Sequence, residues 1–510
     1  MHTEAAEDQE REIALALGSV APETVLAHPL VAARAIDSPV EERLVSTYYD
    51  TADRALAARG IVLRVRQGPR GTVQTVKRGG PKGAGLAARD EWETPLAGPE
   101  PLWPPPIPGE TGDALARIAG KASLAPLFVT DFTRRRCRLA APDGGEVEVA
   151  ADSGEIRAGD RRWPVAEVEL ELKRGDAAAL FDLALDLCRE LPLTLQMVSK
   201  GERGLMLADG SRPRAVTARR PVLDRAMTVA DAFAVLLSAA AGHAASNVPA
   251  IVEQSAPVEG VHQMRVGLRR LRAGLALFKR RLAKRERAAL RRLIRPSLDR
   301  LGPMRDLDVF VDETLPPVLA AFPGDEAVAA FHTQACTSRL AARTALAAFL
   351  ATPECSRDWL AIGRWLAQDH VDDDGPVTDF ARKVLRKCAR RVKRAAKEAV
   401  GGPPDALHVL RIEVKKLRYA GEFFAALFDE ADTRPVLKAL RRAQDALGRL
   451  NDVAVCDAVA AQVRADAPDD PLVARGAGIV AGFVHARAAA ARTEAEAAYA
   501  AFARLRPFWK

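Results

Sequence analysis

Cysteine is scarce in this sequence, with six residues among 510, and the six lie far apart. Their spacing matches no pattern of paired metal ligands, and such isolated thiols do not form the disulfide framework of a small secreted domain. The sequence therefore excludes a cysteine-based zinc site and favours reduced thiols.

The chain also lacks a long uninterrupted hydrophobic run. The stretch "FAVLLSAAAG" is too short to cross a bilayer, and charged residues interrupt the alanine-rich C-terminal segment. Nothing in the first residues resembles a signal peptide. We therefore expect a cytoplasmic protein that has no membrane partner.

A net positive charge is absent from the first part of the chain and pronounced in the second. Residues 1–220 carry 30 Lys and Arg against 33 Asp and Glu, whereas residues 221–510 carry 45 against 34. The second part is therefore the one that attracts anions.

The length of 510 residues and the apolar content of 48% predict two or more domains, each with its own core. Short alternating segments between Gly, Pro and Asp turns predict strands through the first 205 residues. After a linker-like segment at 208–221, the pattern changes to long helices with a period of 3.6 residues. We predict an α+β multidomain protein with a strand-rich domain at 1–207 and an all-α domain at 222–510.

Charged residues recur at every second position of several predicted strands, so they point to one face while apolar residues point to the other. The rows are Glu167, Glu169, Glu171 and Lys173; Arg64 and Arg66; Thr75 and Lys77; and Arg134, Arg136 and Arg138. Each row alone fits the solvent face of a half-buried sheet. Together, rows of both signs fit an antiparallel β-barrel in which cations would hold a polyphosphate and carboxylates a divalent metal ion.

Seven segments, in order along the first 205 residues, resemble the CYTH domain of the triphosphate tunnel metalloenzymes: "YYDT", "LRVR", "TVK", "RDEWE", "EVEVAADSGE", "EVELELK" and "SKGERG". The resemblance implies an eight-stranded antiparallel tunnel that binds triphosphates with Mg2+ or Mn2+. Members hydrolyse inorganic triphosphate or thiamine triphosphate, and a few are adenylate cyclases. The implied phosphate-binding residues are Arg64, Arg66, Lys77, Arg134, Arg136, Lys173, Lys200 and Arg203. The implied metal ligands are Glu10, Glu12, Asp152, Glu169 and Glu171, and the four glutamates among them are the catalytic candidates.

The first strand departs from the family pattern E-x-E-x-K. In "EREIA", Glu10 and Glu12 match, but Ala14 stands at the lysine position, and a register shifted by two would match Glu12 alone. Removing one fixed electrostatic donor typically costs about a hundredfold or more in turnover. The departure therefore weakens the prediction of hydrolysis more than that of binding, which is spread over the other basic residues. Glu10 and Glu12 also fit a frayed acidic N-terminus.

The segment "VHQMRVGLRRLR" at 261–272 returns as "LHVLRIEVKKLR" at 407–418. When His262 is aligned with His408, the basic positions that follow are basic in both copies. Asp306 and Asp452 each follow their histidine by 44 residues. We therefore predict an internal duplication, at about 222–375 and 376–510, with one basic stripe on each of two related helices.

The two H-x-x-R helices and their duplicated spacing resemble the CHAD domain, the conserved histidine alpha-helical domain, over about 222–508. The resemblance implies that a basic surface binds inorganic polyphosphate. The implied contacts are His262, Arg265, Arg269, Arg270, Arg272, His408, Arg411, Lys415, Lys416, Arg418 and Tyr419. The histidines also fit ordinary structural positions. Two further basic segments, "FKRRLAKRERAALRRLIR" and "ARKVLRKCARRVKRAAKEAV", fit either an extension of this surface or a solvated face.

Aromatic residues make up 5% of the sequence, and near the two stripes Tyr419 has no counterpart. Because single-stranded nucleic acids need stacking platforms, a flexible phosphate chain is the better partner. The predicted function is polyphosphate binding, in the cytoplasm or at polyphosphate granules, by a protein whose metal-dependent tunnel is an inorganic triphosphatase. The alternative that the tunnel is catalytically weak and that the protein acts as a polyphosphate-binding module is not excluded by the sequence. A nucleotide cyclase is the weakest alternative, because no adenine-specific motif is visible.

Overall fold

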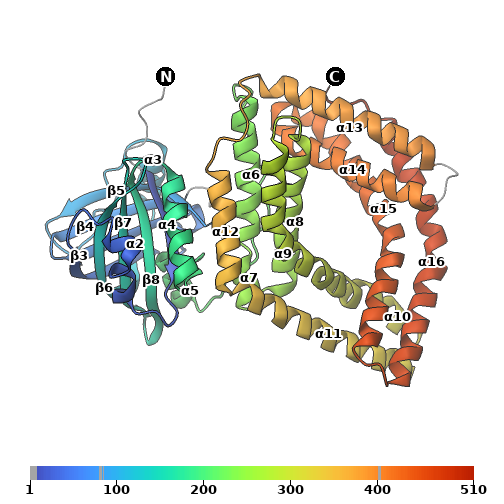
Figure 1. Ribbon diagram of the computed structural model, residues 1–510, viewed down its shortest axis with the longest axis horizontal. Coiled ribbons are helices and arrows are strands. Elements are labelled where there is room, and N and C mark those ends of the chain that lie inside the picture. Colours follow the sequence, from blue (N-terminus) through green and yellow to red (C-terminus); the bar gives the residue numbers. More distant parts are fainter. Residues whose placement is uncertain (1–8, 80–82, 84, 400–403, 510) are drawn as a thin grey trace. The chain divides into compact units, whose positions relative to one another are not determined.

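The computed structural model describes residues 9–79, 83, 85–399 and 404–509 (Figure 1). The chain divides into two compact units. Unit 1 comprises residues 1–216, 241–256 and 349–368, and unit 2 comprises residues 217–240, 257–348 and 369–510. Two segments of the predicted helical domain therefore group with the strand-rich part. The domain boundary at 208–221 stays a prediction.

Unit 1 is built on an antiparallel barrel. Its strands are β1 (Gln9–Ala16), β2 (Val40–Thr51), β3 (Ile61–Gly68), β4 (Gly71–Gly79), β5 (Ala87–Leu96), β6 (Leu124–Ala140), β7 (Glu146–Ala158) and β8 (Arg161–Arg174). The strand order is β5-β4-β3-β2-β6-β7-β8-β1, and pairing of β1 with β5 closes the sheet, while the short β9 (Thr194–Leu195) pairs with β1. The prediction of an eight-stranded antiparallel barrel is confirmed, and the alternative of an open half-buried sheet is wrong.

The hydrophobic core of unit 1 lies mainly outside the barrel wall. Along β8, Val168 and Leu170 are fully buried and pack with Ile13 and Leu15 of β1. Helices α4 (Ala177–Glu190), α1 (Pro22–Leu26) and α12 (Pro353–Leu366) contribute to the same core. Because strand side chains alternate between faces, burying the apolar face outward turns the charged rows toward the barrel interior.

A second cluster covers another part of the wall. Leu115 and Ile118 of α3 (Gly109–Ala119) pack on Leu63 of β3 and Val76 of β4. Both strands therefore have an apolar outer face, which leaves Arg64 of β3 and the other residues of its row facing inward.

Helix α5 (Lys200–Asp209) packs against β6, β7 and β8. Ser199 and Glu202 form a capping box at its first turn, which satisfies the free backbone N–H groups there. This start of the helix brings Lys200 and Arg203 into buried positions. Gly204 lies directly against the ring of Phe128 on β6.

The rest of the chain is helical. The helices are α6 (Val229–Ala245), α7 (Val248–Val252), α8 (Pro257–Leu277), α9 (Lys284–Val309), α10 (Leu315–Ala321), α11 (Glu326–Leu350), α13 (Val377–Ala399), α14 (Pro404–Phe424), α15 (Glu430–Ala465) and α16 (Pro471–Ala503), with a π-helical turn at Phe310–Thr314. The two related basic segments form α8 and α14, which have equal lengths and contact each other. Arg270 of α8 lies 3.4 Å from Glu422 of α14.

Residues 229–252, which include α6 and α7, form a helical stretch of 24 residues that is long and apolar enough to cross a membrane. The expectation that this stretch is too short was therefore wrong. Within its most apolar window, 67% of the residues are buried in the structure, as in a core helix of a soluble protein. The absence of a membrane partner stays a prediction.

The close contact at Gly204 predicts a strong effect of one methyl group. A Cβ atom there would lie 2.0 Å from Cε2 of Phe128, whose ring stacks on Tyr48. We expect Gly204→Ala to lower the free energy of unfolding of unit 1 by about 1–3 kcal/mol. Gly98→Ala is the matched control, because nothing lies within 4 Å of its Cβ position. Urea unfolding measures the stability of both variants. Equal stability of Gly204→Ala and Gly98→Ala would contradict this packing.

Candidate functional site

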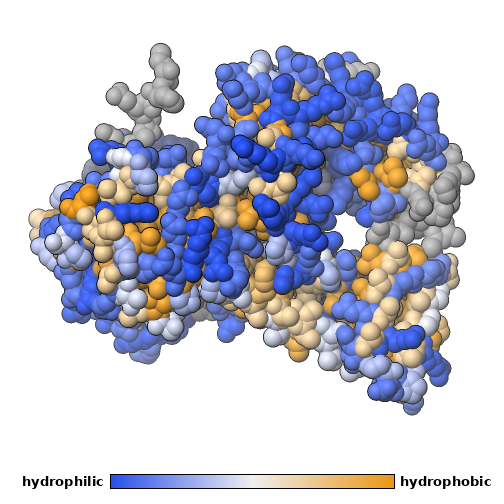
Figure 2. Space-filling model, viewed as in Figure 1, coloured by the Kyte–Doolittle hydropathy of each residue, from blue (hydrophilic) through white to orange (hydrophobic). Residues whose placement is uncertain are grey.

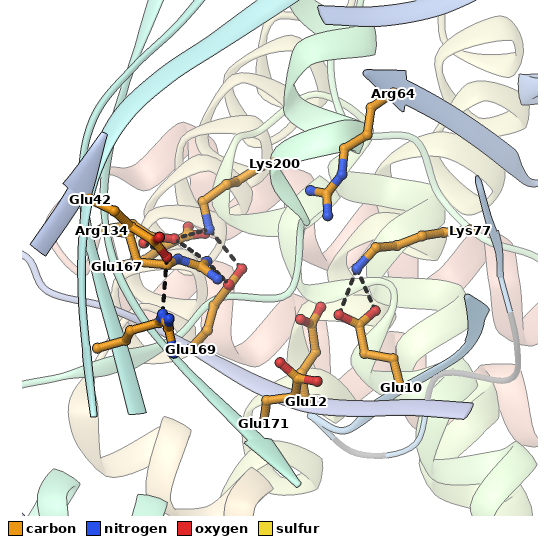
Figure 3. A network of polar contacts seen from close by, with 12 residues as sticks. Glu10, Glu12, Glu42, Arg64, Lys77, Arg134, Glu167, Glu169, Glu171 and Lys200 are labelled. Carbon is orange, nitrogen blue, oxygen red and sulfur yellow. Dashed lines mark hydrogen bonds and ion pairs between the residues drawn. The ribbon is translucent and has the colours of Figure 1, made fainter. Parts of the chain in front are cut away.

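The barrel encloses a cavity of about 570 Å³ that is lined by side chains of both charge signs. Its lining includes every phosphate-binding residue predicted from the sequence except the more deeply buried Arg203, together with Glu10, Glu12, Glu169 and Glu171. Figure 3 shows carboxylates and cations pointing toward one another across this interior. The interior of the barrel is therefore a charged site rather than an apolar core.

One cluster joins β7, β8 and α5. Asp152, Glu167 and Glu169 place carboxylate oxygens within 4.8 Å of one another. The Nζ atom of Lys200 lies 2.7 Å from Asp152 and 2.7 Å from Glu169, and it also contacts Glu167. Burial alone would raise the pKa of Glu169, but attraction by Lys200 and Arg134 holds it well below its usual value.

Two arginines complete this cluster. Arg134 of β6 donates two hydrogen bonds to Asp152, at 2.8 and 2.7 Å, and a further one to Glu169. Arg203 donates to Glu167. Three cations thus neutralise two buried carboxylates and one half-buried carboxylate, which is the condition under which such charges are tolerated in a protein interior.

A second cluster joins β1, β3, β4 and β5. Nζ of Lys77 donates to both carboxylate oxygens of Glu10 at 2.6 Å and lies 3.2 Å from Glu91. Arg64 lies 3.8 Å from the same Glu91. Burial opposes ionisation of Glu10, but the attraction of Lys77 lowers its pKa overall.

Glu12 lies among other carboxylates of the cavity. It faces Glu171 directly across the β1–β8 pair, and its ion-pair partner is Arg89 at 3.0 Å. Burial, together with repulsion from Glu169 and Glu10, raises the pKa of Glu12 to about 7. Burial also raises the pKa of Glu171, although Lys173 lies 2.7 Å away.

A third cluster joins β2, β6 and β7. Arg136 lies 3.0 Å from Glu42 and 3.0 Å from Glu148. Arg66 also lines the cavity, as does Arg70, whose side chain is 75% exposed and lies 3.9 Å from Glu42. The basic residues of this region are thus more accessible than Lys200 and Arg203.

The first strand has the register expected from the sequence. Glu10, Glu12 and Ala14 all line the cavity, and Ala14 lies opposite Glu169 of β8. The alternative of a frayed acidic N-terminus is wrong for Glu10 and Glu12, because both lie in β1. No cation faces the cavity from position 14.

Several cavity residues were missed from the sequence. They are Glu42, Arg89, Glu91, Glu93, Glu148 and Glu167 as a partner of Lys200 and Arg203. A usable signal was present in "RDEWE", where Arg89, Glu91 and Glu93 alternate like the other rows. Arg138 continues the row of Arg134 and Arg136, but it is half-exposed and pairs with Asp37 and Glu146 instead.

The donor set of the cavity fits a divalent cation. Mg2+ and Mn2+ prefer carboxylate oxygens, and Glu12 and Glu171 lie directly opposite each other on β1 and β8 with Glu10 and Glu169 in the same inward rows. Asp152, Glu167 and Glu169 offer a second set of converging oxygens, which Lys200 and Arg134 already occupy.

Unit 2 contains a groove of about 640 Å³ between the related helices. Its lining includes His262, Arg269 and Arg270 of α8, Arg418 and Tyr419 of α14, and Arg441 of α15. Part of each predicted stripe thus lines this groove: His262 and Arg269 on α8, and Arg418 on α14.

Positive charge is crowded beside this groove. Burial, together with repulsion from Arg269, Arg411, Arg265 and Arg418, lowers the pKa of Lys415 to about 7. Burial and neighbouring arginines, led by Arg305, also lower the pKa of His262. A polyanion bound here would relieve this repulsion.

Other predicted contacts point elsewhere or have partners. His408 and Arg272 are exposed, and Arg265 lies 3.7 Å from Asp306. Lys416 pairs with Glu413 at 2.6 Å, and it does not line the groove as its counterpart Arg270 does. The side chain of Asp452 lies outside the described residues.

Helix α13 carries nine Lys and Arg against two acidic residues. Among the described residues its one ion pair joins Arg382 to Asp379 at 3.7 Å. Burial and repulsion from Arg280, Arg391 and Lys279 lower the pKa of Lys387, so the turn that follows α8 adds to this basic surface. Figure 2 shows hydrophilic side chains gathered over this helix.

Comparison with known proteins gives two domain matches. The model of the CYTH domain matches residues 29–205, and that of the CHAD domain matches residues 235–461. An inorganic triphosphatase of Haemophilus influenzae is 34% identical over 172 residues, which are 32% of this chain and 46% of that relative. The chain thus spans about half the length of this curated relative.

A solved structure is similar to the helical part. The crystal structure of the CHAD domain from the plant Ricinus communis is 28% identical, with a TM-score of 0.52. The similarity covers 57% of this chain and 98% of that domain.

The raised pKa of Glu12 predicts a stability that depends on pH. Its usual pKa is 4.5, so the stabilisation by protonated Glu12 is full below about pH 4.5 and is lost as the pH rises through about 7. Glu12→Gln stays neutral at every pH. We therefore expect its free energy of unfolding to exceed that of the wild type by roughly 2–3 kcal/mol at pH 8, and by much less at pH 5.

Urea unfolding of the metal-free protein at the two pH values measures this difference. Glu155→Gln is the control, because this half-exposed carboxylate of β7 pairs with Arg162 away from the cavity. A Glu12→Gln effect of equal size at both pH values would contradict the assigned titration.

Proposed function

Because the chain combines a CYTH domain at residues 29–205 with a CHAD domain at residues 235–461, we propose that it is a metal-dependent inorganic triphosphatase that also binds inorganic polyphosphate. The observation that carries the proposal is the barrel cavity, where fixed cations and carboxylates of low exposure face one small volume. Such an arrangement suits a compact, highly charged phosphate chain and its metal ion.

The cations of the cavity would bind and orient the triphosphate. The residues that line the cavity come from different strands and from α5, so they can contact phosphate groups from several sides: Arg64, Arg66, Lys77, Arg134, Arg136, Lys173 and Lys200. Arg203, behind them, would hold Glu167 in place. Guanidinium groups hold phosphate oxygens in a bidentate manner, and this positioning supplies much of the catalysis of phosphoryl transfer.

The carboxylates would hold the metal ion and the attacking water. Glu10, Glu12 and Glu171, with Glu169 and Asp152 beside them, are the candidates for Mg2+ or Mn2+. A bound divalent cation supplies a Lewis acid that neutralises phosphate oxygens. Ionised Glu12, with a pKa near neutrality, is suited to accept a proton from water.

A catalytically weak tunnel is the second candidate. The observation that favours it is the absence of a cation at Ala14, together with ion pairs that already engage Lys77, Arg134 and Lys200. A triphosphate would have to exchange places with these carboxylates. In that case the protein would bind triphosphate and polyphosphate without hydrolysing them. A cyclase is disfavoured, because no adenine-specific motif accompanies the phosphate-binding residues.

The groove of unit 2 would bind long polyphosphate. Crowded cations around Lys415 favour a ligand with many negative charges and no fixed shape. The basic surface of α13 would extend this contact beyond the groove. Tyr419 is nearly fully buried, with an exposure of 3%, and thus offers no open platform for a nucleic-acid base. Localisation in the cytoplasm, including at polyphosphate granules, belongs to this proposal.

The catalytic part is tested by phosphate release from tripolyphosphate. We expect release by the wild type only with Mg2+ or Mn2+, and a loss of about a hundredfold or more in Glu10→Gln/Glu12→Gln, because metal ligands are removed. Glu155→Gln should retain wild-type activity. Full activity of the double variant would refute the assigned carboxylates, and binding without release by the wild type would favour the weak tunnel.

The polyphosphate part is tested by matched charge removal. We expect Arg269→Gln/Arg418→Gln to weaken binding of long-chain polyphosphate by about tenfold or more, because fixed contacts in the groove are lost. Arg386→Gln/Arg390→Gln removes the same charge from α13 and should cost less. Titrations at several salt concentrations, with DNA as competitor, measure both effects. Equal losses of affinity in the two double variants would mean that general surface charge, rather than the groove, makes the main contact with polyphosphate.

A further inference from the structure

Arg89 lies in the wall of the cavity, although it belongs to none of the residue sets identified from the sequence. It comes from β5, where its backbone lies opposite Glu10 of β1. Its side chain is 18% exposed, and Nη2 lies 3.0 Å from Oε1 of Glu12. A half-buried guanidinium therefore reaches across the strand pair that closes the barrel.

The carboxylates around this guanidinium differ in their compensation. Glu10 and Glu171 flank Glu12 on β1 and β8, and Glu169 is the next inward residue of β8. Each of these three has its own cation: Lys77 for Glu10, Lys173 for Glu171, and Lys200 with Arg134 for Glu169. Among the described residues, Arg89 is the ion-pair partner of Glu12. Arg89 is thus the cation that compensates Glu12, which has Glu171 directly opposite.

The neighbouring side chains leave room for a ligand beside Arg89. Ala14 continues the inward row of β1 and lies opposite Glu169, while Ala87 lies opposite Glu12 on β5. Both line the cavity with a methyl group only. Strand β1 therefore presents two carboxylates and no cation to the interior.

We propose that Arg89 is a triphosphate-binding residue that supplies, from β5, the fixed positive charge that β1 does not carry at Ala14. The planar guanidinium has donors on two edges, so it can keep Glu12 in place on one edge and bind a phosphate oxygen on the other. A lysine at position 14 would place its ammonium group in the same part of the cavity, between Glu169 and Glu12. The inference rests on the proposed function in that the ligand is a triphosphate in the barrel.

The test is binding of tripolyphosphate to the metal-free protein, measured by calorimetry. We expect Arg89→Gln to weaken binding by about tenfold or more, and Arg89→Gln/Ala14→Lys to recover most of the loss, because the charge returns to the same place. Arg78→Gln is the matched control, since Arg78 pairs with Glu110 outside the cavity. It should bind within about twofold of the wild type.

A second background separates ligand contact from mere neutralisation of Glu12. In Glu12→Gln, which removes the partner and keeps the variants foldable, Arg89→Gln should again weaken binding by about tenfold. The inference is overturned if Arg89→Gln does not weaken tripolyphosphate binding in the Glu12→Gln background. It is also overturned if Ala14→Lys does not recover the affinity that Arg89→Gln loses. Binding that is intact in the wild type without phosphate release would refute only the proposed hydrolysis. Absence of wild-type binding would refute both.

Discussion

The pairing of opposite charges inside the barrel is the constraint on which the rest of unit 1 depends. A buried ion without a partner costs several kcal/mol, so inward rows of carboxylates are compatible with folding only when inward cations face them. Lys200 illustrates the requirement, because it meets three carboxylates from two strands. The apolar residues that would normally fill such a barrel lie on its outer face instead, under α4, α1 and α3. The same alternation that builds the sheet thus produces a hydrophobic core outside and a polar chamber inside.

The two units use charge in different ways. In the barrel, ion pairs between carboxylates and cations hold each side chain in place before a ligand binds. A triphosphate would displace carboxylates from these cations. Beside the groove of unit 2, several cations lie close together, and burial with repulsion from neighbouring arginines lowers the pKa of Lys415. Balanced charge favours a precise site for a short ligand and its metal ion, whereas surplus charge favours many weak contacts along a chain. This difference supports the proposed division between a triphosphate tunnel and a polyphosphate surface.

Much of the site could be predicted because strand rows and the helix repeat are local patterns. The inward row of β8 and the register of Glu10 and Glu12 follow from alternation. Arg89 is not among the predicted residues, because the match of "RDEWE" to a family motif does not show which of its side chains face inward. Which residues of the helical stripes line the groove is harder to predict, because a change in the rotation of one helix about its axis moves a side chain to another face. Arg270 lines the groove, for example, while Lys416 at the equivalent position pairs with Glu413.

The sequence by itself determined which residues share a face, where strands give way to helices, and that one helical segment is repeated. These features depend on periods of two and 3.6 residues, which are set within a few neighbouring positions. The tertiary structure alone decided the partners: that β1 closes on β5, that Arg89 meets Glu12, and that α8 and α14 share a groove. An ion pair needs its atoms within about 4 Å, and residues distant in the chain reach that separation only after the barrel has closed and the helices have packed.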